Sequence, residues 1–108
     1  MQGANTSAVL TLVAGRSAVM AVLALRIVNE KGLHARASAR FVEVVEEYDA
    51  SAEVRRDGMV VSGDSIMGLL MLAASRGTTI EVETSGLQAE ALAAALTALV
   101  ADRFGEDR

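Results

Sequence analysis

Residues 31–40 read KGLHARASAR and contain His34, the only histidine of the 108-residue chain. This window carries Lys31, Arg36 and Arg40 and no carboxylate, although the whole chain has a formal net charge of −4. A cationic site in an anionic protein indicates an anionic ligand. We therefore take His34 as the centre of a candidate anion site and interpret the rest of the chain as its scaffold.

The residues after His34 predict a helix over 35–48. Its polar side carries Arg36, Arg40, Glu43 and Glu47, and its apolar side carries Ala37, Phe41, Val44, Val45 and Tyr48. No Ser, Thr, Asp or Asn stands at the cap position, so the first amides, including those of Ala35 and Arg36, lack an obvious partner. An imidazole there could accept a phosphoryl group, with the helix N-terminus and Arg36 holding its oxygens. The residues alone leave open a second interpretation, in which His34 is a surface residue or a cap.

Two motifs carry a resemblance to a known family. Gly32-Leu33-His34-Ala35-Arg36 resembles the active-site motif of HPr, the histidine-containing phosphocarrier family of the bacterial phosphotransferase system. Residues 65–70, SIMGLL, resemble the family's second-helix motif at the expected separation, and the similarity extends over residues 22–104. Residues 29–32, 69–72 and 80–83 look closest to the nitrogen-related branch, NPr.

The resemblance implies that His34 accepts a phosphoryl group from enzyme I through Nδ1, that Arg36 contacts this group, and that a IIA-type protein receives it. It implies a cytoplasmic monomer with a regulatory output. It also implies a carrier that is not an enzyme, because it turns over only with partner proteins, and no metal or organic cofactor. Most family members have proline where this chain has Ala37, and we expect Ala37→Pro still to accept phosphate.

Composition limits the function classes. The length predicts one domain with a two-layer core. The absence of cysteine excludes disulfides and thiolate metal sites, and a single histidine argues against a structural zinc site. Aromatic residues make up only 3% of the chain, and with the negative charge this argues against nucleic-acid binding.

The first 20 residues differ from the rest. No basic residue precedes their apolar run, as a signal peptide would require, and residues 8–15 are too short to span a bilayer. We predict that residues 1–20 are a disordered extension, or that the true start is Met20. The domain is then expected over residues 21–104, with a frayed tail over 105–108.

Hydrophobic periodicity predicts an α+β fold. Strands are expected over residues 21–28, 50–56, 59–62 and 78–84, and helices over 35–48, 65–74 and from the capping-box pattern 85–88 to 103. The last helix has Leu92, Leu96 and Leu99 as its buried stripe. This order, βαββαβα, predicts three helices on one face of a four-stranded antiparallel sheet. Pattern alone does not exclude a ferredoxin-like arrangement with an added helix, whereas the resemblance implies the HPr open-faced sandwich with strand order 1-4-2-3.

The helix over 65–74 is apolar nearly all round. Leu69, Leu72 and Ala73 form a natural core face, whereas pattern leaves open whether Ile66, Met67 and Leu70 belong to the core or to the surface. The resemblance implies that these three residues form an exposed docking patch for partner proteins.

Ser65 matches the serine that HPr kinase/phosphorylase modifies in many family members, and an unmodified helix cap is the alternative interpretation. A different class of function would be an HPr-fold binding module that acts through Ser65 and the apolar patch. The presence of both His34 and Arg36 argues against it, because a pure binding module needs neither.

Overall fold

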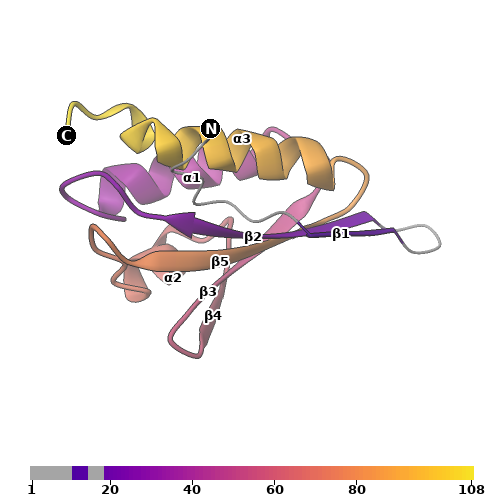
Figure 1. The fold of residues 1–108 in the computed structure, drawn as a ribbon, viewed down its shortest axis with the longest axis horizontal. Helices are drawn as coiled ribbons and strands as arrows, with labels where there is room; N and C mark the ends of the chain where they lie inside the picture. Colours follow the sequence, from indigo (N-terminus) through magenta and orange to yellow (C-terminus); the bar gives the residue numbers. More distant parts are fainter. Residues whose placement is uncertain (1–10, 15–18) are drawn as a thin grey trace.

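The computed structural model describes residues 11–14 and 19–108 (Figure 1). Along the chain the elements are strands β1 (Thr11–Ala14) and β2 (Val19–Arg26), helix α1 (Ala35–Glu46), strands β3 (Ser51–Arg56) and β4 (Met59–Ser62), helix α2 (Ile66–Met71), strand β5 (Thr79–Ser85), helix α3 (Ala89–Ala101) and the short 3-10 helix η1 (Arg103–Gly105).

The sheet is antiparallel with the strand order β1-β2-β5-β3-β4. Its last four strands follow the expected order 1-4-2-3, so the predicted α+β sandwich of three α-helices and a four-stranded antiparallel sheet is confirmed. In the central pair, Leu23 of β2 lies opposite Val82 of β5, and Val82 lies in turn opposite Val54 of β3. Three apolar side chains therefore line up across the middle of the sheet.

The strand expected over residues 21–28 begins earlier, at Val19, and ends at Arg26. Thr11–Ala14 pairs with its outer edge as β1, which places Leu12 opposite Ala21. Pairing satisfies backbone groups that an edge strand would otherwise leave open. Residues 1–10 and 15–18 lie outside the described ranges. The expectation of a disordered extension or a start at Met20 therefore falls largely outside the described residues and stays a prediction.

One face of the sheet is covered and the other is open. Helices α1 and α3 lie across the covered face (Figure 1), where Leu25, Ile80 and Leu96 are almost completely buried. On the open face, Arg55 Nη2 lies 2.6 Å from Glu83 Oε1, and the hydrogen bond to Glu83 raises the pKa of Arg55 against the opposing effect of its desolvation. The alternation of apolar and charged residues along the strands thus separates core from solvent.

Several helix ends differ from expectation: α1 ends at Glu46 rather than at residue 48, and α3 ends at Ala101 rather than at residue 103. Helix α2 stops at Met71, and Ala73 has a φ of 50° and is exposed, so it does not join Leu69 and Leu72 in the core. The predicted capping box of α3 is wrong, since Gln88 makes no side-chain cap bond to α3. Its Oε1 instead accepts a hydrogen bond from the Asp49 amide at 2.7 Å, because the turn after α1 lies within its reach. In the expected stripe of α3, Leu92 and Leu96 are buried and Leu99 is half-buried.

Candidate functional site

The loop between β2 and α1 is fixed before it reaches His34. The buried Asn29 Nδ2 donates to the Gly32 carbonyl at 2.8 Å, and the Leu33 amide donates to the Ala74 carbonyl at 2.9 Å. Gly32 has a φ of 68°, and a Cβ atom there would stand 2.6 Å from the Ala74 oxygen. Only glycine fits this position. The close contact with Ala74 holds the loop against the segment after α2 and places His34 at the start of α1.

His34 is itself the N-cap of α1. Its Nδ1 accepts a hydrogen bond from the Arg36 amide at 3.3 Å, so the expectation that this amide lacks a partner is wrong. The extended backbone of His34 brings the ring over the first turn, which allows an imidazole to replace the usual capping oxygen. Among the described residues, the amides of Ala35 and Ala37 have no hydrogen-bond partner. An accepting Nδ1 carries a free electron pair, as a nucleophile requires.

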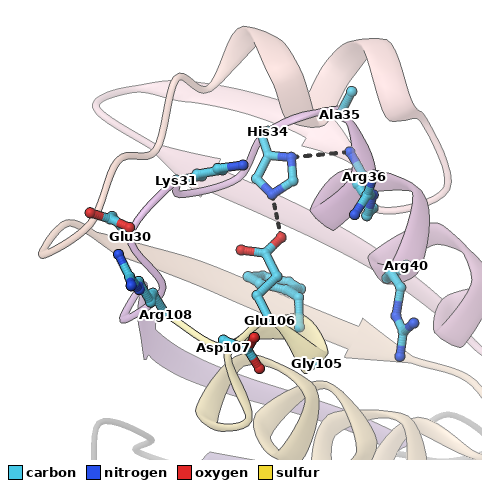
Figure 2. A pocket seen from close by; sticks show the side chains of 11 residues that line it. Glu30, Lys31, His34, Ala35, Arg36, Arg40, Gly105, Glu106, Asp107 and Arg108 are labelled. Carbon is cyan, nitrogen blue, oxygen red and sulfur yellow. Dashed lines mark hydrogen bonds and ion pairs between the residues drawn. The ribbon is translucent and has the colours of Figure 1, made fainter.

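Glu106 binds the other ring nitrogen. Its Oε2 is hydrogen-bonded to His34 Nε2, and its Oε1 accepts a hydrogen bond from Asn29 Nδ2 at 3.0 Å (Figure 2). Burial opposes ionisation of this carboxyl, but the hydrogen bonds from Asn29 and His34 and the charges of His34 and Lys31 outweigh it and lower its pKa. A buried asparagine, a carboxylate and the imidazole therefore form one connected chain.

The sequence interpretation missed Glu106. It placed this residue in a frayed tail over 105–108, whereas the structure folds Glu106 onto the site with its side chain only 18% exposed. The reason is a reversal of the chain after α3: Arg103, Phe104 and Gly105 have φ angles of 57°, 56° and 81°, and the Phe104 side chain is buried. Nothing in the local pattern marks a partner 72 positions away.

These residues border an open cavity of about 820 Å³. Its lining consists of Glu30, Lys31, His34, Ala35, Arg36, Arg40, Phe104, Gly105, Glu106, Asp107 and Arg108. In the view of Figure 2, Arg36 and Arg40 project from α1 on one side of the imidazole and Lys31 lies on the other. Within residues 11–14 and 19–108, neither Arg36 nor Arg40 makes an ion pair. Both guanidinium groups are exposed and can contact an anion at His34.

Helix α2 presents the second predicted site. The expected docking residues face solvent, with Ile66 40%, Met67 70% and Leu70 36% exposed, whereas Leu69 is completely buried. Met71, one turn after Met67, is 63% exposed and was not predicted. We call Ile66, Met67, Leu70 and Met71 the α2 patch. The structure thus places Ile66, Met67 and Leu70 on the surface, whereas the sequence pattern did not distinguish between surface and core for them.

Ser65 is the N-cap of α2. Its Oγ accepts a hydrogen bond from the Gly68 amide at 2.9 Å, so the serine has a structural role without any modification. No described group of three or more His, Cys, Asp or Glu side chains could hold a metal ion. In the same part of the chain, no helix is long and apolar enough to cross a membrane.

Comparison with known proteins places the chain in a family. Residues 22–102 match the family model for the PTS HPr component phosphorylation site. The phosphocarrier protein HPr of Neisseria meningitidis serogroup A is 44% identical over 82 residues, which are 76% of this chain and 92% of that protein. The phosphocarrier protein NPr of Escherichia coli K12 is 38% identical over 84 residues, which are 77% and 93% of the two chains.

Solved structures agree with the fold. The crystal structure of HPr-C-His from Thermoanaerobacter tengcongensis aligns with a TM-score of 0.77 at 32% identity, covering 81% of this chain and 98% of the other. A phosphocarrier protein HPr from Bacillus anthracis aligns with a TM-score of 0.72 at 34% identity, covering 75% and 96%.

Proposed function

We propose, from the premise that this chain belongs to the HPr family of the phosphotransferase system, that His34 is its phosphoryl acceptor and that Arg36 contacts the phosphoryl group. The chain is a phosphocarrier rather than a catalytic enzyme, and it works with other proteins of that system. The observation that carries the proposal is His34 Nδ1, which accepts the Arg36 amide hydrogen bond at the N-terminus of α1, beside an open cavity that Lys31, Arg36 and Arg40 help to line.

The geometry suits a phosphoryl group on Nδ1. The incoming group would displace the weak contact from the Arg36 amide and accept hydrogen bonds from the first amides of α1, where the helix dipole favours negative charge. The Arg36 guanidinium has no competing carboxylate among the described residues and would bind the equatorial oxygens. The site therefore offers a nucleophile and the donors to hold what it accepts.

The partners follow from the same premise. Enzyme I is the proposed donor and a IIA-type protein the proposed acceptor, in the cytoplasm and in the nitrogen-related regulatory branch. That branch is supported by its resemblance to residues 29–32, 69–72 and 80–83. Overall sequence identity does not favour the branch, because the identity to the Neisseria HPr is higher than the identity to the E. coli NPr. The α2 patch is the proposed docking surface, because exposed methionine and leucine side chains adapt to several partners in turn.

The test is intact mass after incubation with enzyme I and phosphoenolpyruvate. We expect the wild type to gain one acid-labile phosphoryl group and His34→Ala to gain none. No gain in the wild type with an active, cognate enzyme I would refute the carrier proposal and favour a binding module that uses the HPr fold.

The same assay tests Ser65 when HPr kinase/phosphorylase and ATP replace enzyme I. Regulation at Ser65 predicts an acid-stable phosphoryl group that persists in His34→Ala and is absent from Ser65→Ala. Incorporation into Ser65→Ala would exclude Ser65 as the modified residue.

A further inference from the structure

We propose that Glu106 is a positioning residue for phosphoryl transfer: its carboxylate keeps the proton of His34 on Nε2 and stabilises the positive charge that the ring gains when Nδ1 is phosphorylated. The inference deepens the proposed function of His34 and rests on it. It assigns a role to a residue outside both sequence motifs and outside the segment 22–102 that matches the family model.

The two ring nitrogens have partners of opposite character. The Glu106 carboxylate can only accept a hydrogen bond, so a hydrogen bond between it and Nε2 requires a proton on Nε2. The Arg36 amide can only donate, so Nδ1 must present its electron pair. Together the two contacts select one tautomer of the neutral ring, and it is the tautomer in which Nδ1 is the nucleophile.

The carboxylate is itself held in place. Asn29 is completely buried, and its Nδ2 gives one hydrogen to Gly32 O and the other to Glu106 Oε1. Rotating this amide by half a turn would point its oxygen at two acceptors, so the amide orientation is fixed. The buried Phe104 anchors the reversed chain immediately before Glu106. Backbone and side-chain contacts thus aim one carboxylate oxygen at the back of the ring.

The transfer step balances without a proton leaving the site. The Nδ1 electron pair forms the nitrogen–phosphorus bond while the bond from phosphorus to the donor breaks and its electron pair stays with the donor. The ring keeps its Nε2 proton and becomes an imidazolium, whose charge the Glu106 carboxylate offsets, as an orienting carboxylate does behind a catalytic histidine. In onward transfer the bonding pair returns to Nδ1 and the neutral tautomer is restored.

Glu106→Gln tests this role with almost no change in shape. Asn29 Nδ2 would then bind the Gln amide oxygen, and the Gln amino group would face His34 Nε2. A donor at that position requires an unprotonated Nε2, which moves the ring proton to Nδ1. We therefore expect the ¹⁵N chemical shifts of the neutral His34 ring to show the proton moved from Nε2 to Nδ1. We also expect the kcat for phosphorylation by enzyme I to fall about tenfold with KM unchanged, because a charged hydrogen bond is lost.

Two further variants keep the test decisive. Glu106→Ala leaves Nε2 to water and should give a mixture of tautomers and a smaller fall in kcat, which also serves if the Gln variant does not fold. Glu90→Gln makes the same change at an exposed residue at the start of α3, the end of that helix away from Glu106, and should match the wild type in both measurements.

A folded Glu106→Gln or Glu106→Ala protein with the wild-type tautomer and wild-type kcat overturns the proposal. So does a loss of thermal stability with no change in the ring shifts, because Glu106 would then have only a structural role. The ring shifts are measured without enzyme I. If the wild type takes up no phosphoryl group, the proposed function of His34 fails, and the shifts still show whether Glu106 selects the tautomer.

Discussion

His34 combines two roles at the residue scale. Its Nδ1 caps the first turn of α1, and the same nitrogen is the proposed phosphoryl acceptor. The hydrogen bond to the Arg36 amide is long, at 3.3 Å, and partly exposed, so losing it to an incoming phosphoryl group costs little. The cap therefore orients the proposed nucleophile in the unphosphorylated protein without opposing the proposed reaction.

Ala37 allows a prediction at the same scale. The first intrahelical bond of α1 runs from the Ser38 amide to the His34 carbonyl, and the Ala37 amide before it has no partner among the described residues. Proline at this position removes no existing hydrogen bond and suits a first helical turn. We expect Ala37→Pro to accept a phosphoryl group and to change the free energy of unfolding by no more than about 1 kcal/mol.

Intact mass and urea unfolding would check this expectation. Ala37→Gly, which keeps the amide, is the matched control. Loss of phosphoryl uptake in a folded Ala37→Pro protein would instead show that the Ala37 amide is a required donor to the phosphoryl group.

At the scale of the element, α2 buries one residue in the core and exposes several apolar residues to solvent. Leu69 is completely buried, and the Ser65 cap fixes where the helix begins. Because α2 spans only six residues, its two faces are defined by its packing beside α1 rather than by a long amphipathic pattern. The apolar side chains of the α2 patch face solvent.

Met67 offers the sharpest test of the α2 patch, as it is 70% exposed. We expect Met67→Gln to leave the free energy of unfolding within about 0.5 kcal/mol of the wild type, because the side chain packs against little. We expect its KM as a substrate of enzyme I to rise about tenfold, because a central apolar anchor of the interface is lost.

The matched control is Met59→Gln, on the β3–β4 hairpin, where Met59 is 39% exposed and outside the α2 patch. Steady-state phosphorylation by enzyme I and urea unfolding measure both quantities. Equal KM values for the two variants would remove Met67 from the docking surface.

At the scale of the whole molecule, the C-terminal segment closes the site. Glu106 joins the turn after α3 to the loop before α1. It contacts His34 and also accepts a hydrogen bond from Asn29, the residue that donates to the Gly32 carbonyl. The last residues of the chain thus hold the loop that presents His34, which makes the site a product of both ends of the domain.

This closure predicts a pH dependence of stability. The folded-state pKa of Glu106 is lowered from its usual value of 4.5, so the pair contributes stability above that value and loses it as pH falls through the folded pKa. The free energy of unfolding of the wild type should exceed that of Glu106→Gln by about 1 kcal/mol at about pH 6, and by almost nothing at about pH 2. Urea unfolding of both proteins across this range measures the difference. A difference that stays constant with pH would show that Glu106 stabilises the fold only by packing.

The sequence alone determined much of this protein. Alternation along the strands predicted the sheet, and the two motifs pointed to the right family, whereas the role of His34 as phosphoryl acceptor stays a prediction. These features are local, since periodicity and turn chemistry depend on neighbouring residues. The capping box at Gln88 failed for the converse reason, because a tertiary partner, Asp49, competed for its side chain.

Only the tertiary structure decided which apolar side chains of α2 face solvent and which carboxylate lies behind the imidazole. A helix that is apolar all round does not say which side its neighbours will cover. Glu106 sits in a charged tail whose pattern matches any solvated chain end, and its partner is 72 residues earlier. Contacts of this kind arise when α3 packs on the sheet and the buried Phe104 turns the chain back, so no local stretch of sequence contains them.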